Sequence, residues 1–360
     1  MSPNDRYMLV SKDRQSYVRI DGNKVGKGQF FTTKSSWLLP QIIDFIRECK
    51  PEAVVDPFVG LGDLLTHVDE IVPQSKRIGY DIEPKGGAIC NDSLVEVPVH
   101  ARSVIVTNPP YLAKHSAKRK RVWKDSAKYY AMGRNDLYQV ALDRCLESCD
   151  RVVAIVPETF LNSSYPKNHL RHVTIVEHDL FHDTDCPVCI VCFDNKQKKL
   201  SEIPIYRDEE KLGTLQGFED VRMRPQKTIK IQFNDPTGTI ALRAVDLQDI
   251  KKPIQFMRRD EIGYPIEMVK VSSRLVTFLS IPSISEEQVD AVILAANRIL
   301  EEYRDETCDV VLSPFKGNRK DGRRRRRLDY RTARALLEKA VCSALGESNC
   351  ESNLFAEVSV

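Results

Sequence analysis

The sequence predicts an α/β fold, with a mostly parallel sheet of about seven strands in the first part of the chain and a separate C-terminal α+β domain. Short β-branched runs alternate with helical segments through about residue 195, and this alternation is typical of a parallel sheet. After the polar segment 196–199 the alternation ends, and short strand-like pieces with turn signals replace it. We therefore expect a domain boundary near residue 198.

Composition and charge are those of an ordinary soluble protein. The chain has 360 residues, a net charge of +3 and ten cysteines without the dense spacing of a small secreted scaffold. Such cysteines fit reduced thiols. The N-terminus lacks a signal-peptide pattern, and no apolar run approaches membrane-spanning length. We expect a cytoplasmic protein with no membrane partner. In a bacterium, that location would be the cytosol or the nucleoid.

Residues 1–25 are mixed and polar, and we expect an N-terminal arm or a short hairpin there. The segment 28–33, Gly-Gln-Phe-Phe-Thr-Thr, then precedes a helix that begins near Trp37. It places hydroxyls and backbone amides at a helix start, a position that suits an anionic ligand.

Two strands that follow each end in an acid. The run 53–55 leads into Asp56 and a turn with Gly60 and Gly62, and a helix is expected from Asp63. The turn is not the G-x-G-x-x-G dinucleotide fingerprint. The next strand ends at Asp81, where doubly wound folds place an acid on a ribose hydroxyl pair. A third acid, Asp92, comes before the next strand.

That next strand, 103–107, leads directly into Asn108-Pro109-Pro110-Tyr111. In an open parallel sheet this strand end is where ligands bind. The prolines fix their own backbone and restrict Asn108 to extended conformations. Polar acceptors are thus held beside an aromatic ring, an arrangement that suits a planar amino group.

This ordered set of motifs resembles the amino-group methyltransferases that depend on S-adenosylmethionine, and within them the N6-adenine DNA methyltransferases of bacterial restriction-modification systems. The tetrapeptide at Asn108 resembles the catalytic motif of the family, and residues 56–62 resemble its cofactor loop, in which Pro57 and Leu61 depart from a glycine-richer form. Residues 28–33 resemble its N-terminal cofactor segment. The resemblance covers about residues 26–195, and the order of the segments resembles the gamma arrangement of these enzymes.

The resemblance implies a Rossmann-like catalytic domain over 26–198 and a DNA target-recognition domain over 199–360. It implies that Asn108 and the Pro109 carbonyl, held with Pro110, accept the hydrogens of the target amino group. Tyr111 would stack on a base rotated out of double-stranded DNA, with Phe193 as a second aromatic face. The cofactor residues that the resemblance implies are Phe31, Thr32, Asp56, Pro57, Gly60, Asp81, Ile82, Asp92 and Asn108.

Two basic segments are candidates for phosphate contact. Residues 114–134 hold eight Lys or Arg against one Asp, with aromatic residues between them, and residues 323–327 are five arginines. Either segment can instead be a solvated surface. We expect DNA contacts from Lys118, Arg119, Lys120, Arg121, Arg323, Arg324 and Arg325.

The C-x-x-C motif does not indicate a metal site, and alternative functions remain. The C-x-x-C at Cys186 and Cys189 has no second pair at zinc-ligand spacing, so we expect buried thiols and no metal. Two alternatives stay open: an N-methyltransferase that acts on RNA bases or on a protein glutamine, and a non-catalytic nucleic-acid-binding protein with a methyltransferase fold. N4-cytosine is a further possible target. We expect a monomer, whose partner endonuclease, if one exists, acts on the same site without stable binding.

Overall fold

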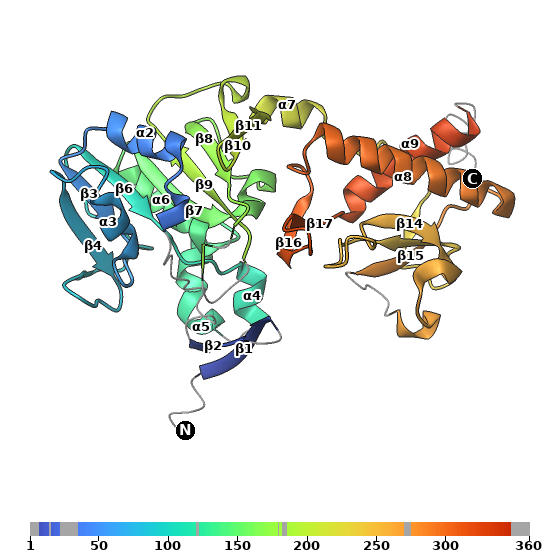
Figure 1. The fold of residues 1–360 in the computed structure, drawn as a ribbon, viewed down its shortest axis with the longest axis horizontal. Coiled ribbons are helices and arrows are strands. Elements are labelled where there is room, and N and C mark those ends of the chain that lie inside the picture. The colour runs from blue at the N-terminus through green and yellow to red at the C-terminus, as the bar shows by residue number, and fades with distance from the viewer. Residues whose placement is uncertain are drawn as a thin grey trace. The chain divides into compact units, whose positions relative to one another are not determined.

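The computed structural model describes residues 7–13, 16–21, 35–119, 122–178, 180–181, 186–269 and 275–346. The chain divides into two compact units, Met1–Gln216 and Gly217–Val360 (Figure 1). Among the predicted site residues, Phe31, Thr32, Lys120 and Arg121 lie outside the described residues. No helix within the described ranges is long and apolar enough to cross a membrane.

The N-terminal unit is built on a nine-stranded sheet with the order β11-β10-β8-β9-β7-β6-β3-β4-β5. Its strands are β3 (Ala53–Asp56), β4 (Lys76–Asp81), β5 (Ile89–Cys90), β6 (Ser103–Thr107), β7 (Val152–Pro157), β8 (Leu170–Ile175), β9 (Val188–Phe193), β10 (Pro204–Arg207) and β11 (Glu210–Thr214). Five neighbouring strands, from β5 to β7, run parallel. β9 runs antiparallel to both β7 and β8.

The strand count differs from the prediction of about seven. The seven strands from β5 to β8 correspond to the expected sheet, and β10 and β11 extend it. β10 pairs parallel to β8, and β11 pairs antiparallel to β10. The sheet therefore continues past residue 198, and the division between the units comes after Gln216. Polar residues 196–199 are a connection within the unit, because a strand on either side of them belongs to the same sheet.

Helices connect these strands. Those of the N-terminal unit are α2 (Pro40–Glu48), α3 (Asp63–Val68), α4 (Lys114–Arg119), α5 (Trp123–Ser126) and α6 (Leu137–Ser148), with short 3-10 turns η2 (Ser35–Trp37), η3 (Ala127–Met132), η4 (Glu158–Asn162) and η5 (Leu200–Glu202). The helix α7 (Leu215–Asp220) spans the division between the two units. The antiparallel pair β1 (Tyr7–Asp13) and β2 (Ser16–Asp21) forms a hairpin, one of the two structures expected for residues 1–25.

The core of this unit lies between the sheet and the helices α2 and α3, which pack against one face of it (Figure 1). Trp37, Ile42 and Ile46 contribute fully buried side chains from the helical side. Cys189 and Cys192 are fully buried in β9, and burial raises the pKa of both thiols. The prediction of buried thiols is confirmed for Cys189, whereas Cys186 of the same motif is half-buried. Burial of apolar side chains on both sides of the strands is typical of a parallel sheet and fixes the strand ends that carry the site.

The C-terminal unit contains an antiparallel sheet with the order β12-β15-β13-β14, a two-stranded sheet β16-β17 and two long helices. Its elements are β12 (Gln232–Phe233), β13 (Ile240–Arg243), β14 (Gln255–Arg258), η6 (Arg259–Ile262), η7 (Ile266–Met268), β15 (Val276–Ser280), η8 (Glu286–Gln288), α8 (Val289–Glu306), β16 (Ser313–Asn318), β17 (Arg324–Arg327) and α9 (Tyr330–Leu345). The edge strand β14 is partly closed by α8, because the Asn297 amide bonds both the backbone N–H and the C=O of Phe256 at 2.9 Å.

Candidate active site

A cavity of about 340 Å³ lies in the N-terminal unit, beside the carboxyl ends of β3, β4 and β6. Seven of the predicted site residues line it: Asp56, Gly60, Asp81, Ile82, Asp92, Asn108 and Pro110. They come from segments up to about fifty residues apart, and parallel strands bring them to one edge of the sheet. The cavity also includes residues that were not predicted, among them Leu112, Ser126 and Tyr129.

Asp56 lies at the end of β3 and is 1% exposed. Its Oδ1 accepts hydrogen bonds from the Phe58 backbone N–H at 3.0 Å and from the Thr107 hydroxyl at 2.7 Å. Burial raises the pKa of Asp56 to about 7, against the opposing effect of these two donors. The carboxyl therefore changes charge near neutral pH.

Asp81 lies at the end of β4 and fixes the turn after β3. Its Oδ2 accepts a hydrogen bond from the Gly60 backbone N–H at 3.0 Å, and its Oδ1 accepts one from Glu83 N–H at 2.9 Å. Gly60 and Gly62 have φ values of 56° and 89°, which favour glycine. The turn thus brings its backbone to the cavity wall in a conformation that larger residues rarely adopt.

Asn108 and Tyr111 contact each other in the loop after β6. The Tyr111 hydroxyl lies within hydrogen-bond distance of Asn108 Oδ1 and, at 2.8 Å, of the Ile155 carbonyl oxygen. The Tyr111 ring packs edge-to-face against Phe181, with centroids 6.4 Å apart. Asn108 lines the cavity, whereas Tyr111 is not among its lining residues.

Leu112, the residue after this tetrapeptide, has both its backbone N–H and its carbonyl oxygen hydrogen-bonded. Asp136 Oδ1 accepts a hydrogen bond from Leu112 N–H at 2.9 Å, and the Tyr130 hydroxyl donates to the Leu112 carbonyl at 2.5 Å. Burial raises the pKa of Asp136 to about 6. Asp136 also stands at the N-cap position of α6, so the loop is tied to a helix start. No pattern in the sequence indicated this contact between Asp136 and Leu112.

Asp92 contacts the basic segment 114–134. Its Oδ2 accepts hydrogen bonds from the Tyr129 hydroxyl at 2.8 Å and from Lys128 Nζ at 3.0 Å. Two residues of the segment that was predicted to contact phosphate therefore contact the third acid of the cavity.

Some predicted site residues lie elsewhere. Pro57 and Pro109 are buried and do not line the cavity. The prediction for Phe193 is wrong: it is 1% exposed and packs against Phe160 and Tyr165. Because β9 runs antiparallel to β7, Phe193 pairs with Val152 at the start of β7, at the opposite edge of the sheet from Asn108. Phe181, which the sequence did not single out, is the aromatic residue beside Tyr111.

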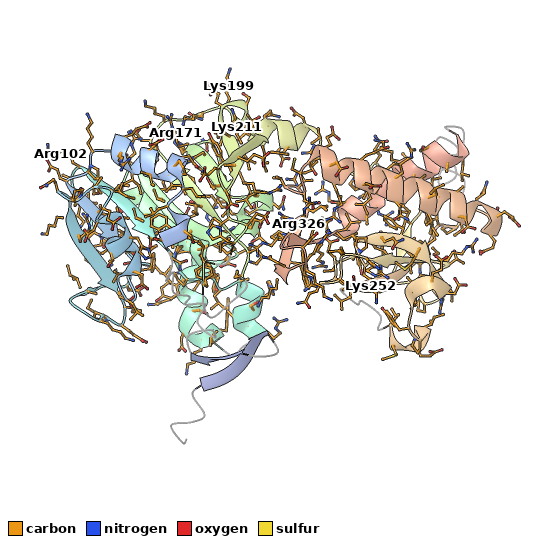
Figure 2. All side chains as sticks on the ribbon, viewed as in Figure 1. Arg102, Arg171, Lys199, Lys211, Lys252 and Arg326 are labelled. Carbon is orange, nitrogen blue, oxygen red and sulfur yellow. The ribbon has the colours of Figure 1, made fainter. Side chains whose placement is uncertain are left out.

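The predicted phosphate-binding residues divide by burial. Lys118, Arg119 and Arg323 are exposed, Arg325 is half-buried, and Arg324 is 4% exposed and bonds Asn318 Oδ1 at 3.0 Å. The five-arginine run is largely the strand β17, paired with β16, and is not a free surface loop. Arg326 of the same strand, labelled in Figure 2, is 1% exposed, whereas Lys199 and Lys211 of the N-terminal unit are exposed. Arg324 is thus poorly placed for phosphate contact.

Residues 103–183 match the family of Eco57I restriction-modification methylases. The matched segment begins with β6 and includes Asn108, Tyr111 and the basic segment. The match confirms the predicted resemblance to restriction-modification methyltransferases. The search of curated proteins gave no significant match.

Three solved structures are distantly similar to this chain. A class I S-adenosylmethionine-dependent methyltransferase of Listeria monocytogenes, described as putative, has 13% identity, a TM-score of 0.35, and coverage of 49% of this chain and 65% of its own. A type I restriction-modification methyltransferase subunit from Streptococcus thermophilus has 16% identity, a TM-score of 0.37 and coverage of 56% and 54%. The EcoKI M protein has 13% identity, a TM-score of 0.35 and coverage of 92% and 74%. The chain thus spans 65% and 54% of the length of the first two.

Proposed function

We propose that this relative of the restriction-modification methylases transfers a methyl group from S-adenosylmethionine to the N6 amino group of an adenine in DNA. The observation that carries the proposal is the single cavity that joins three acids at strand ends with Asn108 and Pro110 of the tetrapeptide. A cofactor and an amino acceptor can meet only where both sets of residues face the same space.

The residues of the cavity fit such a cofactor. Ile82 and Leu61, which line it, are 51% and 60% exposed, so apolar surface is available beside carboxylates. An adenosine combines an apolar ring face with polar edges and ribose hydroxyls, which suits Ile82 next to Asp81. Ionised Asp56 would attract the positive charges of the methionine portion, while Asp92 would accept from the adenine amino group.

When bound, S-adenosylmethionine supplies a methyl group activated by a sulfonium. The task of the protein is then to orient the target amino group and to make its lone pair available. Asn108 Oδ1 and the Pro109 carbonyl oxygen would accept the two amino hydrogens, drawing the nitrogen toward a tetrahedral form. Asn108 Oδ1 accepts from the Tyr111 hydroxyl in this structure, and its second lone pair leaves it able to accept an amino hydrogen. No covalent nucleophile is needed, since orientation and electrostatics carry the step.

The target nitrogen is engaged in base pairing within a duplex, so the nucleotide has to leave the stack. We propose that Tyr111 stacks on the extruded base after its ring leaves Phe181. Exposed Lys118 and Arg119 of α4 follow the tetrapeptide closely in the chain and would contact nearby phosphates. We further propose that residues 217–360 recognise the DNA sequence, as the target-recognition domain of the enzyme.

Methylation assays with purified protein, tritiated S-adenosylmethionine and plasmid DNA test the proposal, with RNA and a total protein extract as competing acceptors. The wild-type protein should label DNA, and nuclease digestion should yield N6-methyladenine. Asn108→Ala should abolish labelling, with the affinity for S-adenosylhomocysteine unchanged within about twofold. Labelling of RNA or protein in place of DNA, or near-normal turnover of Asn108→Ala, would contradict it.

A further inference from the structure

The two oxygens of the Asp92 carboxylate have different surroundings. Its Oδ2 accepts from the Tyr129 hydroxyl at 2.8 Å and from Lys128 Nζ at 3.0 Å, and the ammonium of Lys128 lies 4.6 Å from the centroid of the Tyr129 ring. No hydrogen bond within the described parts of the chain reaches its Oδ1. Oδ2 is therefore occupied by donors, and Oδ1 is open to one more.

The open oxygen belongs to the cavity wall. Asp92 and Tyr129 both line the 340 Å³ cavity, and the Asp92 side chain is 26% exposed. A carboxylate fixed through one oxygen presents the other as a pure acceptor in a defined direction. Such a group accepts a hydrogen bond from an amino group and repels a carbonyl oxygen at the same position.

We propose that Tyr129, assisted by Lys128, is a positioning residue that orients Asp92 and so sets the preference of this cavity for an amino-bearing purine, adenine, over a 6-oxo purine. The inference rests on the proposed function, because that function makes the adenine of S-adenosylmethionine the ligand of Asp92. Neither Lys128 nor Tyr129 was assigned to the cofactor by the sequence motifs.

Tyr129 is the stronger anchor of the two. The Lys128 side chain is 61% exposed, and an ion pair in that setting contributes little because water screens it and the long side chain loses entropy. Tyr129 is half-buried and has only two side-chain torsions to fix. Loss of the Tyr129 hydroxyl should therefore matter more than loss of the Lys128 charge.

The test compares Tyr129→Phe with Tyr206→Phe, a matched control. Tyr206 lies on β10 of the same unit, and no hydrogen bond of its hydroxyl is found among the described residues. Isothermal titration calorimetry measures the affinity of each protein for S-adenosylhomocysteine and for S-inosylhomocysteine, its 6-oxo counterpart. Circular dichroism checks that each variant is folded.

The wild-type protein should bind the adenosyl compound at least about tenfold more tightly than the inosyl compound, because the 6-oxo group places an acceptor where the amino group would donate to Asp92. Tyr129→Phe should weaken adenosyl binding about fivefold to tenfold and leave inosyl binding nearly unchanged, so that the ratio of affinities shrinks. Lys128→Met should reduce the ratio less, and Tyr206→Phe should not change it.

If Tyr129→Phe weakened the binding of both compounds equally, the residue would have a general structural role and the inference would be overturned. An unchanged ratio of the two affinities would overturn it as well. In either case adenosyl binding by the wild-type protein would leave the proposed function standing. A wild-type protein that binds neither compound would contradict the proposed function and the role of Tyr129 together.

Discussion

The hydroxyl of Thr107 donates a hydrogen bond to the Asp56 carboxylate over 2.7 Å, and each residue is 1% exposed. The contact joins the last residue of β6 to the last residue of β3, fifty-one positions earlier in the chain. Thr107 directly precedes Asn108, so one buried bond ties the strand end that carries the tetrapeptide to the strand end that carries an acid of the cavity.

Thr107→Val keeps the shape of the side chain and removes this bond. Above pH 8 Asp56 is ionised, and a hydrogen bond to a charged acceptor contributes about 1.5–3 kcal/mol, so unfolding should require that much less free energy. The loss should be smaller at pH 5.5, where Asp56 is protonated. Urea unfolding at both pH values measures it. Thr174→Val is the control. Thr174 is fully buried and accepts a hydrogen bond from the neutral Gln41 amide, so the loss of unfolding free energy in this variant should not depend on pH.

Asp56 should make stability depend on pH, because burial raises its pKa from 3.8 to about 7. The folded protein then binds the extra proton between about pH 4 and pH 7, so this group favours folding at low pH, and its contribution is lost as the pH rises through about 7. The difference in unfolding free energy between wild type and Asp56→Asn isolates the effect. From pH 4 to pH 8, the unfolding free energy of Asp56→Asn should rise relative to that of wild type by on the order of 4 kcal/mol. A constant difference would show that Asp56 stays charged throughout.

Asp246 of the C-terminal unit is fully buried. It accepts two hydrogen bonds from the Arg304 guanidinium at 2.9 Å and one from the Arg326 backbone N–H at 3.1 Å. Asp246→Ala should lower the unfolding free energy of this unit by about 3–5 kcal/mol, because it leaves a mostly buried charge with fewer partners. Arg298→Ala is the control, since it removes the exposed pair with Glu302 and should cost under about 1 kcal/mol. Equal effects of the two variants in chemical denaturation would contradict this role.

Salt dependence of DNA affinity tests the basic residues. Lys118→Gln with Arg119→Gln should reduce the slope of log Kd against log salt concentration by about 2, because each phosphate contact contributes about 0.9. Arg323→Gln, at an exposed position, should reduce it by about 1. Arg324→Gln should mainly lower stability, because that side chain is buried against Asn318. Unchanged slopes in the variants at exposed positions would indicate that segments 114–134 and 323–327 are solvated surface and do not contact phosphate.

The local features of the site follow from short patterns in the sequence. β-Branched runs identified the strands, an acid or Asn108 followed directly after them, and the glycines of the turn after β3 have the positive φ values that favour glycine. These features depend on residues close together in the chain, so a pattern of a few positions is enough to reveal them. The cavity that joins Asp56, Asp81, Asp92 and Asn108 follows from the rule that parallel strands share one carboxyl edge.

The contacts that these groups make depend on how segments distant in the sequence pack together. The antiparallel direction of β9 places Phe193 at the opposite end of the strands from Asn108. Arg324 is buried in a strand that pairs with β16. Asp92 contacts Tyr129, thirty-seven residues later in the chain, and no local pattern encodes this contact. The division after Gln216 likewise depends on β10 pairing with β8. Hydrogen bonding across a sheet and burial of charge are properties of segments distant in sequence, and their outcome is set by how the whole unit packs.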